Sequence, residues 1–146
     1  MAFVGDALNL DAVFRQLRAH EGLRLLPYTD TTGHVSIGYG RNLTDCGISA
    51  TEADFLLSND IERVVRELHR EIPWWVSLDD VRQRVLVDLA FNVGIKGLLG
   101  FRRVLRALEA RDYQGAADEM LFSTWATQVG PRALALAAMM ATGHAE

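Results

Sequence analysis

Hydrophobic residues near the N-terminus recur at helical spacing. The repeat is carried by Leu10, Val13, Phe14 and Leu17. Such a repeat is typical of an amphipathic helix, and Gly22 stands where a helix C-cap glycine belongs. The pattern over Leu8 to His20 therefore predicts a first helix, which ends near Glu21.

The next segment, from Leu23 to Thr44, has the composition of strands. Its strand-forming residues are Tyr28, Val35, Ile37 and Tyr39. They surround the sequence Asp-Thr-Thr-Gly at 30–33, whose residues favour a turn. We expect a small antiparallel hairpin sheet here.

Two long amphipathic segments follow the predicted hairpin. Ser49 and Glu52 form a capping box, which opens a helix that Pro73 closes. The apolar positions of this helix are Ala53, Leu56, Leu57, Ile61, Val64, Val65 and Leu68. A second start signal, Ser77 with Asp80, opens the helix that we expect to be central. Its apolar positions are Val81, Val85, Leu86, Leu89 and Val93.

Shorter helices are predicted in the C-terminal third of the chain. Glycines are expected to break the chain into short turns before them, at Gly94, Gly97 and Gly100. Two short helices are predicted over 101–110 and 113–122, with Asp112 as an N-cap between them. A last helix begins at Pro131 and terminates at Gly143. Its expected apolar face consists of Leu134, Ala137, Ala138 and Ala141.

These elements predict an α+β fold that is mainly α, with a small antiparallel hairpin sheet, a long connecting helix and a C-terminal helical lobe. No repeat or low-complexity linker divides the 146 residues, so we expect a single domain over 1–146. Hydrophobic residues make up 49% of the chain and charged residues 23%. This is the composition of a folded globular protein.

The charge balance argues against a nucleic-acid partner. The chain carries 15 basic and 19 acidic side chains, for a net charge of -4, whereas nucleic-acid-binding domains are typically basic. Cys46 is the only cysteine, so no intramolecular disulfide is expected. Met1–Leu17 lacks the unbroken apolar run of a signal peptide or membrane span. We expect a monomer without stable membrane insertion.

Glu21 and Asp30 are candidates for a pair of catalytic carboxyl groups. Glycoside hydrolysis needs one protonated carboxyl group and a second that activates water or attacks the sugar. The end of a helix disfavours a charged carboxylate, which suits Glu21 to the role of the acid. Turn hydroxyls and amides favour the ionised form of Asp30, and Ser36 offers a hydroxyl that could hold the water.

Each of these residues taken singly also has a structural explanation. Acidic residues near helix ends and in turns are most often solvated or cap the backbone. His20 and His34 lack the companion ligands of a metal site, so we expect no metal and no cofactor.

The sequence around the two carboxyl groups forms an ordered set of motifs. The set begins with Glu21-Gly22-Leu23-Arg24-Leu25, Tyr28, Asp30, Gly33, Ser36-Ile37-Gly38-Tyr39-Gly40 and Leu43-Thr44. It continues with Ala90-Phe91-Asn92-Val93-Gly94, Gly100-Phe101, Trp125, Gly130, Arg132-Ala133 and Thr142-Gly143. This set, which covers nearly everything from Glu21 onward, resembles the phage-type lysozymes, glycoside hydrolase family 24.

The resemblance implies a lysozyme-like fold and a muramidase activity. Such an enzyme hydrolyses the β-1,4 bond between N-acetylmuramic acid and N-acetylglucosamine in bacterial peptidoglycan. Glu21 would be the general acid, Asp30 the carboxylate that acts on the nucleophilic water, and Ser36 the hydroxyl that positions this water. The family is regarded as inverting, which requires room for a water between the two carboxyl groups.

The resemblance also implies roles beyond the catalytic set. Leu43 and Phe91 would contact the substrate, and Arg132 would support the catalytic glutamate. The chain departs from the family at Ser36, where threonine is frequent, and at Arg41, where the best-studied members have histidine. Arg41 is assigned a supporting role without pH-sensitive pairing, because guanidinium stays charged.

Other functions and several delivery routes are compatible with the sequence. A lytic transglycosylase would cut the same bond without water, which would leave Asp30 and Ser36 without an evident role. A non-catalytic wall-binding or virion structural module would keep the fold without activity. The enzyme is expected to pass from the host-cell cytoplasm to the periplasm and cell wall, with a holin where membrane lesions are needed. A virion-associated enzyme and a bacterial prophage remnant are the alternatives.

Overall fold

The computed structural model describes residues 8–145. Two compact units divide the chain, an N-terminal unit over Met1–Ala53 and a C-terminal unit over Asp54–Glu146. That they fold as a single domain stays a prediction. Residues 1–7, part of the segment considered above as an export signal, lie outside the described residues. None of the helices within 8–145 combines the length and the apolar character that a membrane span requires.

The first helix, α1 (Leu10–Glu21), ends where the sequence predicts. Asn9 is its N-cap, because the Asn9 side chain accepts a hydrogen bond of 3.0 Å from the Ala12 amide. The helix therefore starts at Leu10 and not at Leu8. Gly22 is the C-cap with φ 70°, a conformation that glycine adopts without a steric penalty.

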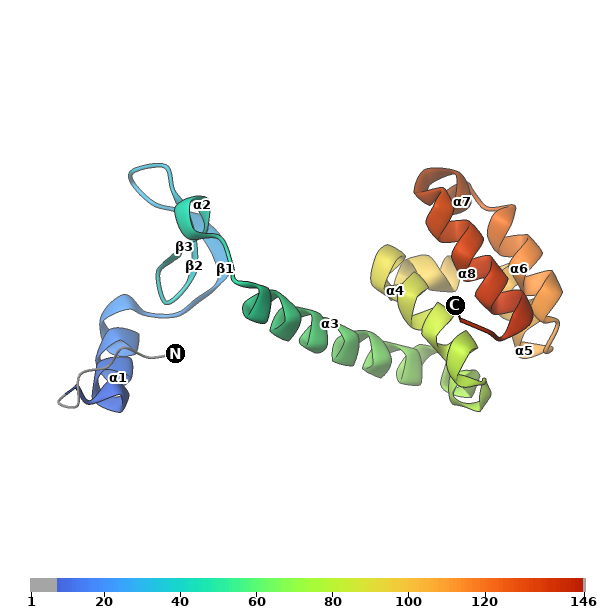
Figure 1. Cartoon of the computed structure of the whole chain (residues 1–146), viewed down its shortest axis with the longest axis horizontal. Helices are drawn as coiled ribbons and strands as arrows, with labels where there is room; N and C mark the ends of the chain where they lie inside the picture. The colour runs from blue at the N-terminus through green and yellow to red at the C-terminus, as the bar shows by residue number, and fades with distance from the viewer. Residues whose placement is uncertain (1–7, 146) are drawn as a thin grey trace. The chain divides into compact units, whose positions relative to one another are not determined.

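The predicted hairpin sheet is confirmed and has one more strand than expected. Strands β1 (Arg24–Thr29), β2 (Val35–Gly38) and β3 (Arg41–Asn42) form an antiparallel sheet in the order β1-β2-β3 (Figure 1). Tyr39 was expected in a strand but lies in the turn between β2 and β3. A one-turn helix, α2 (Leu43–Cys46), follows directly.

The capping box predicted for the long helix α3 (Ala50–Glu71) is confirmed. The Glu52 amide donates to the Ser49 hydroxyl at 3.1 Å, and the Ser49 amide donates to the Glu52 carboxylate at 2.7 Å. Only Val64 and Leu68 of the predicted apolar positions are buried. The hydrophobic face of α3 therefore enters the core of the C-terminal unit in its second half.

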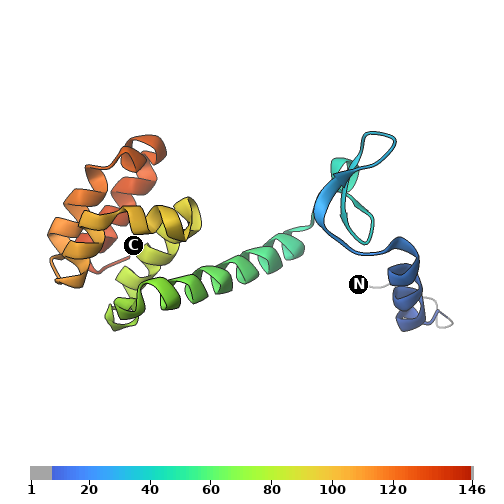
Figure 2. The same cartoon turned by 180° about the vertical axis from the view of Figure 1, so that it is seen from behind.

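The C-terminal unit is a helical lobe around one hydrophobic core. After α3, its elements are the 3-10 helix η1 (Pro73–Ser77) and the helices α4 (Asp80–Gly100), α5 (Arg102–Glu109), α6 (Tyr113–Leu121), α7 (Thr124–Val129) and α8 (Pro131–Thr142). Helix α6 packs against α5 and α8, and α4 and α7 also contact α8 (Figure 2). The largest fully buried side chains of the core include Leu68, Leu86, Leu89, Leu98, Leu108, Met120 and Met140. The structure is thus mainly α with a small sheet, as predicted.

The start of α4 differs from the prediction by its capping residue. Asp79 is the N-cap and accepts from the Arg82 amide at 3.1 Å. Ser77, which was expected to open the helix, instead donates its hydroxyl to the Trp74 carbonyl within η1 at 2.6 Å. Ser77 and Asp80 have the three-residue spacing of a capping box, and so do Asp79 and Arg82. The spacing alone therefore does not distinguish Ser77 from Asp79 as the cap.

The glycines in the second half of α4 affect the chain less than expected. Gly94 has non-helical angles, φ 76° and ψ 163°, and kinks α4. Gly97 and Gly100 were predicted to break the chain, but α4 continues to Gly100. Intrinsic preference costs a helical glycine only about 1 kcal/mol, so the buried residues of this segment, such as Leu98, hold the helix together.

The predicted ends of the last helices are confirmed, whereas the predicted buried face of α8 needs correction. Asp112 caps α6 by accepting from the Gly115 amide at 2.9 Å. Helix α8 begins at Pro131 and ends at Gly143, as expected. Its buried face consists of Ala133, Leu136, Ala137 and Met140, whereas Leu134 is 64% exposed. Ala137 is buried as predicted, but Leu134 was placed on the buried face wrongly, because alanine and leucine occur on every side of this helix.

A buried arginine joins the start of α4 to the end of α8. Arg82 is 8% exposed. It donates to the carbonyls of Met140 (2.7 Å) and Ala141 (3.0 Å) and pairs with Asp79 at 2.9 Å. Its guanidinium lies 3.4 Å from the centre of the Tyr113 ring. These contacts satisfy terminal carbonyls that a helix end leaves without intrahelical partners.

Candidate active site

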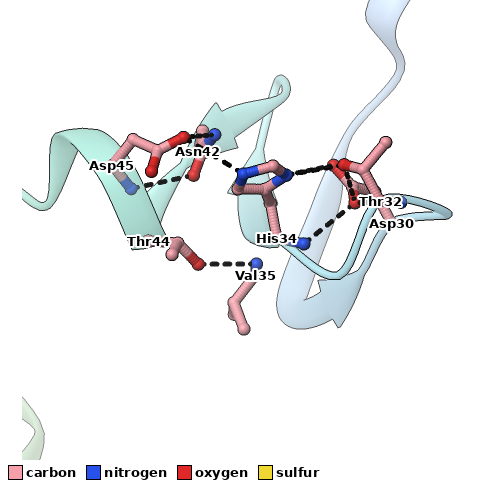
Figure 3. Close-up of polar contacts among 7 residues, drawn as sticks. All are labelled: Asp30, Thr32, His34, Val35, Asn42, Thr44 and Asp45. Carbon is pink, nitrogen blue, oxygen red and sulfur yellow. Dashed lines mark hydrogen bonds and ion pairs between the residues drawn. The ribbon is translucent and has the colours of Figure 1, made fainter.

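Asp30 begins the loop that joins β1 to β2 and organises it with its own carboxylate (Figure 3). Oδ1 of Asp30 accepts from the Thr32 amide at 2.8 Å, the Thr32 hydroxyl at 2.7 Å and the His34 amide at 2.9 Å. The Asp30 amide donates to the His34 carbonyl at 2.9 Å. An aspartate that bonds to backbone amides two to four residues ahead stabilises a turn, so the sequence of the loop fixes the position of this carboxylate.

The same hydrogen bonds set the charge of Asp30. The Thr32 hydroxyl is the largest cause that lowers the pKa of Asp30 below its ordinary value, and the His34 amide is the next. The Thr32 amide and the positive charge of His34 act in the same direction, whereas burial opposes them. This direction agrees with the ionised Asp30 that the sequence predicts.

Glu21, the last residue of α1, places its carboxylate against the turn between β2 and β3. An ideal Cβ atom at Gly40 would lie 3.2 Å from Oε2 of Glu21. One helical turn earlier, Arg18 donates from Nε to the Tyr39 hydroxyl at 2.8 Å. The Arg18 hydrogen bond therefore attaches the end of α1 to this turn, and glycine at position 40 leaves room for the Glu21 carboxylate.

Ser36 occupies the centre of the small sheet. It pairs with Tyr28 of β1 on one side and with Asn42 of β3 on the other. It is 6% exposed and is the only buried residue within 8–53. A residue on a strand that is paired on both edges has little backbone freedom, so the position of Ser36 is well defined.

Arg41 holds the start of α3 to the sheet. Its guanidinium donates to both carboxylate oxygens of Glu52, at 2.9 and 2.6 Å, and to the Gly47 carbonyl at 3.1 Å. The Arg41 hydrogen bond is the largest cause that lowers the pKa of Glu52 to about 2, and Glu52 in turn raises the pKa of Arg41. The partner of Arg41 is thus a residue that the sequence identified only as a helix cap.

The remaining predicted residues lie in both units. Leu43 is the first residue of α2 in the N-terminal unit and is half-buried. In the C-terminal unit, Phe91 and Arg132 line the same groove of about 430 Å³. Phe91 is 44% exposed, and Arg132 donates to Asp88 at 2.9 and 2.5 Å. Contact of Leu43 or Phe91 with a substrate, and support of Glu21 by Arg132, stay predictions.

Sequence reasoning missed His34, which faces Asp30, and Asp45, which faces His34. His34 lies between Asp30 and Asp45, although it was considered only as a metal ligand. The four-residue spacing from Asp30 to His34 within a short hairpin loop was the available signal. The sequence contains no such signal for Asp45, because Asp45 comes close to His34 only when α2 folds beside the sheet. Within residues 8–145, no group of three or more histidine, cysteine or acidic side chains is arranged to hold a metal ion.

Comparisons with known proteins find similar sequences over most of the chain. A family model described as phage lysozyme matches residues 18–139. The endolysin of Salmonella phage P22 is 32% identical over 114 residues, which cover 73% of this chain and 76% of that endolysin. Probable T4-type lysozyme 1 of Dictyostelium discoideum is 23% identical over 156 residues, covering 87% of this chain and 92% of the relative.

A virion protein is also similar to this chain. The pre-baseplate central spike protein Gp5 of Enterobacteria phage T4 is 29% identical over 158 residues. The match covers 89% of this chain but 28% of Gp5. The similarity therefore concerns one part of that larger protein.

Proposed function

Because this chain belongs to the phage lysozyme family, we propose that it is a muramidase with an inverting mechanism. It is a lysozyme-type enzyme that degrades peptidoglycan, as the family and its endolysin relatives indicate. The bond we assign is the β-1,4 bond between N-acetylmuramic acid and N-acetylglucosamine. We further propose that the enzyme works as a monomer without a cofactor.

The observation that carries the proposal is the unequal use of the two Asp30 oxygens. Three donors converge on Oδ1. On Oδ2, the contact within residues 8–145 is His34 Nδ1 at 3.7 Å, which is too long for a hydrogen bond. Oδ1 therefore fixes the carboxylate, and Oδ2 is left to accept a proton from water. A general base needs such a fixed position and an accessible oxygen.

Glu21 supplies the proton that the leaving group needs. It donates this proton to the glycosidic oxygen as the bond between that oxygen and the anomeric carbon breaks. Asp30 accepts a proton from the water that attacks the anomeric carbon from the opposite face. Ser36 holds this water, and Leu43 and Phe91 contact the sugars. The new reducing end has the inverted configuration, because water enters opposite to the leaving group.

Mass spectrometry of fragments released from purified peptidoglycan tests this function. The wild type should release fragments with reducing N-acetylmuramic acid ends, and in H₂¹⁸O these ends should carry the label. Glu21→Gln and Asp30→Asn should each release few fragments while remaining folded. Glu62→Gln is the matched control, since Glu62 is an exposed acid of α3 whose partner Arg66 is 3.9 Å away, and it should act like the wild type. NMR of the first product formed identifies the anomer.

The other candidate functions give different products. Anhydro-muramyl ends without label would assign the protein as a lytic transglycosylase. A folded wild type that binds peptidoglycan and releases nothing would be a wall-binding module. A retained anomeric configuration would reject inversion while keeping the muramidase assignment.

We propose two routes by which the enzyme reaches the wall. Its relatives include proteins named endolysins and SAR-endolysins, which suggests release at the end of infection, with a holin where one is needed. Similarity to the spike protein Gp5 suggests delivery by the virion. Mass spectrometry of purified particles distinguishes them, because only a virion-borne enzyme is present there in fixed proportion to the structural proteins.

A further inference from the structure

The His34 ring lies between two carboxylates that come from different elements (Figure 3). Its Nδ1 atom is 2.6 Å from the Thr32 hydroxyl and 3.7 Å from Asp30 Oδ2. Its Nε2 atom is 3.3 Å from Asp45 Oδ2. The side chains of His34 and Asp30 are each 37% exposed. The ring therefore bridges the Asp30 loop and α2 in contact with solvent.

The hydrogen bonds determine which ring nitrogen carries a proton. The Thr32 hydroxyl has one proton, and Asp30 Oδ1 at 2.7 Å has none to offer, so the hydroxyl donates to Asp30. The same hydroxyl must then accept from His34, which places a proton on Nδ1. Asp45 faces Nε2. Without a proton on Nε2, lone pairs of the ring and of the carboxylate repel each other, whereas a proton on Nε2 makes a charge-assisted contact with Asp45. All these contacts are favourable only in the doubly protonated ring.

Asp45 is held in place independently of His34. The Asn42 side chain donates to Asp45 Oδ2 at 2.8 Å, and the Asp45 amide donates to Asn42 Oδ1 at 3.0 Å. The Val35 amide donates to the Thr44 hydroxyl at 2.9 Å, which attaches α2 to the first residue of β2. Asp45 is thus a fixed anchor, and His34 connects this anchor to Asp30.

We propose that His34 is a positioning residue whose imidazolium form ties Asp30 to Asp45 and makes hydrolysis depend on the charge of His34. The inference rests on the proposed function, in which Asp30 is the base. The charged ring holds the loop from Asp30 to His34 against α2 and keeps Oδ2 of Asp30 directed at the water. When Nε2 loses its proton, the ring no longer donates to Asp45, and the loop is less constrained.

The pH dependence of the rate distinguishes this role from a purely structural one. Among the residues that the structure describes, the charged groups facing the ring are Asp30 and Asp45. The ratio of wild-type kcat to that of His34→Gln should be about fivefold near pH 5.5, as expected for one partly exposed charged contact. It should approach one as the pH rises and Nε2 of His34 loses its proton. Asp45→Asn should behave like His34→Gln, with KM little changed.

A matched control and a spectroscopic readout complete the experiment. His144→Gln changes an exposed histidine just after α8 and should match the wild type at every pH. In ¹⁵N NMR, the neutral form of wild-type His34 should carry its proton on Nδ1, because the Thr32 hydroxyl accepts from it. This readout requires no hydrolysis.

The outcomes distinguish failure of the role of His34 from failure of the proposed function. A kcat ratio that does not change with pH, or a neutral ring protonated on Nε2, would overturn the role of His34 while an active wild type still supports the muramidase. A folded wild type that releases no fragments would reject the proposed function, and the positioning role with it. A pH-dependent ratio together with Nδ1 protonation would establish the role of His34.

Discussion

Oε2 of Glu21 lies 3.2 Å from the point that a Cβ atom at Gly40 would occupy. This distance is shorter than an ordinary contact, so the carboxylate and any side chain at position 40 compete for the same space. Gly40 also has φ +83°, a conformation that residues with a Cβ rarely adopt. Glycine is thus required at position 40 for two reasons: the backbone conformation, and the space that the carboxylate of the proposed acid occupies.

Replacing this glycine tests that relationship. Gly40→Ala should lower kcat by more than tenfold, because a small displacement of a catalytic group is costly. It should also lower the free energy of unfolding by about 1–3 kcal/mol through backbone strain. Gly38→Ala is the control, since Gly38 has φ +71° and nothing within 4 Å of its ideal Cβ. Equal losses of kcat in the two folded variants would show that strain alone is responsible.

Arg41 and Glu52 make the stability of the protein depend on pH in a predictable range. The folded state lowers the pKa of Glu52 from 4.5 to about 2. The ion pair therefore stabilises the fold fully above about pH 4.5, and this contribution is lost as the pH falls toward about 2. Urea denaturation across this range should show that the advantage of the wild type over Glu52→Gln disappears in acid. Glu62→Gln should show a smaller difference above about pH 4.5, because the Glu62 contact with Arg66 is looser.

Two substitutions at Ser36 separate the contribution of its hydroxyl to the rate from that of its side-chain volume. Ser36→Ala should lower kcat by about tenfold with little change in KM, because the water loses a positioning partner. Ser36→Thr should retain activity, since threonine keeps the hydroxyl and its branched side chain restricts rotation. The rates are measured on purified peptidoglycan, and circular dichroism confirms that each variant is folded. Full activity of Ser36→Ala would contradict a role for the hydroxyl.

Arg82 should be a major determinant of the stability of the helical lobe. Arg82→Met leaves the carbonyls of Met140 and Ala141 without their buried donor. The free energy of unfolding should fall by about 3 kcal/mol, in the range for loss of a buried charged partner. Arg84→Met is the control, because the Arg84 side chain is 55% exposed and pairs with Asp80 at 3.6 Å. Similar denaturation midpoints for the two variants would reject this assignment.

The ends of most helices could be predicted because their signals are local. A cap acts over three or four residues, so the Ser49–Glu52 box and the Gly143 terminator predict boundaries without knowledge of the fold. The loop around Asp30 is equally local, since its carboxylate bonds residues up to four positions ahead. The lowered pKa of Asp30 therefore follows from the sequence Asp-Thr-Thr-Gly-His almost unaided.

Features that depend on distant residues could not be predicted in the same way. The strand β3 has two residues, too few to show an alternating pattern. The buried face of α8 contains Leu136 and not Leu134, because the neighbouring helices α4, α6 and α7 select which side is covered. Intrinsic hydrophobicity does not distinguish two leucines of one helix.

The sequence by itself determined most helix boundaries, the hairpin and the candidate residues that carry the resemblance to phage-type lysozymes. Only the tertiary structure decided which charges meet: Arg41 with Glu52, Arg132 with Asp88, and His34 with Asp45. The partners in these pairs are separated by 11, 44 and 11 positions of the chain. Capping and turn formation act between neighbours along the chain, whereas a salt bridge needs only proximity in space, which exists once the helices and strands have packed.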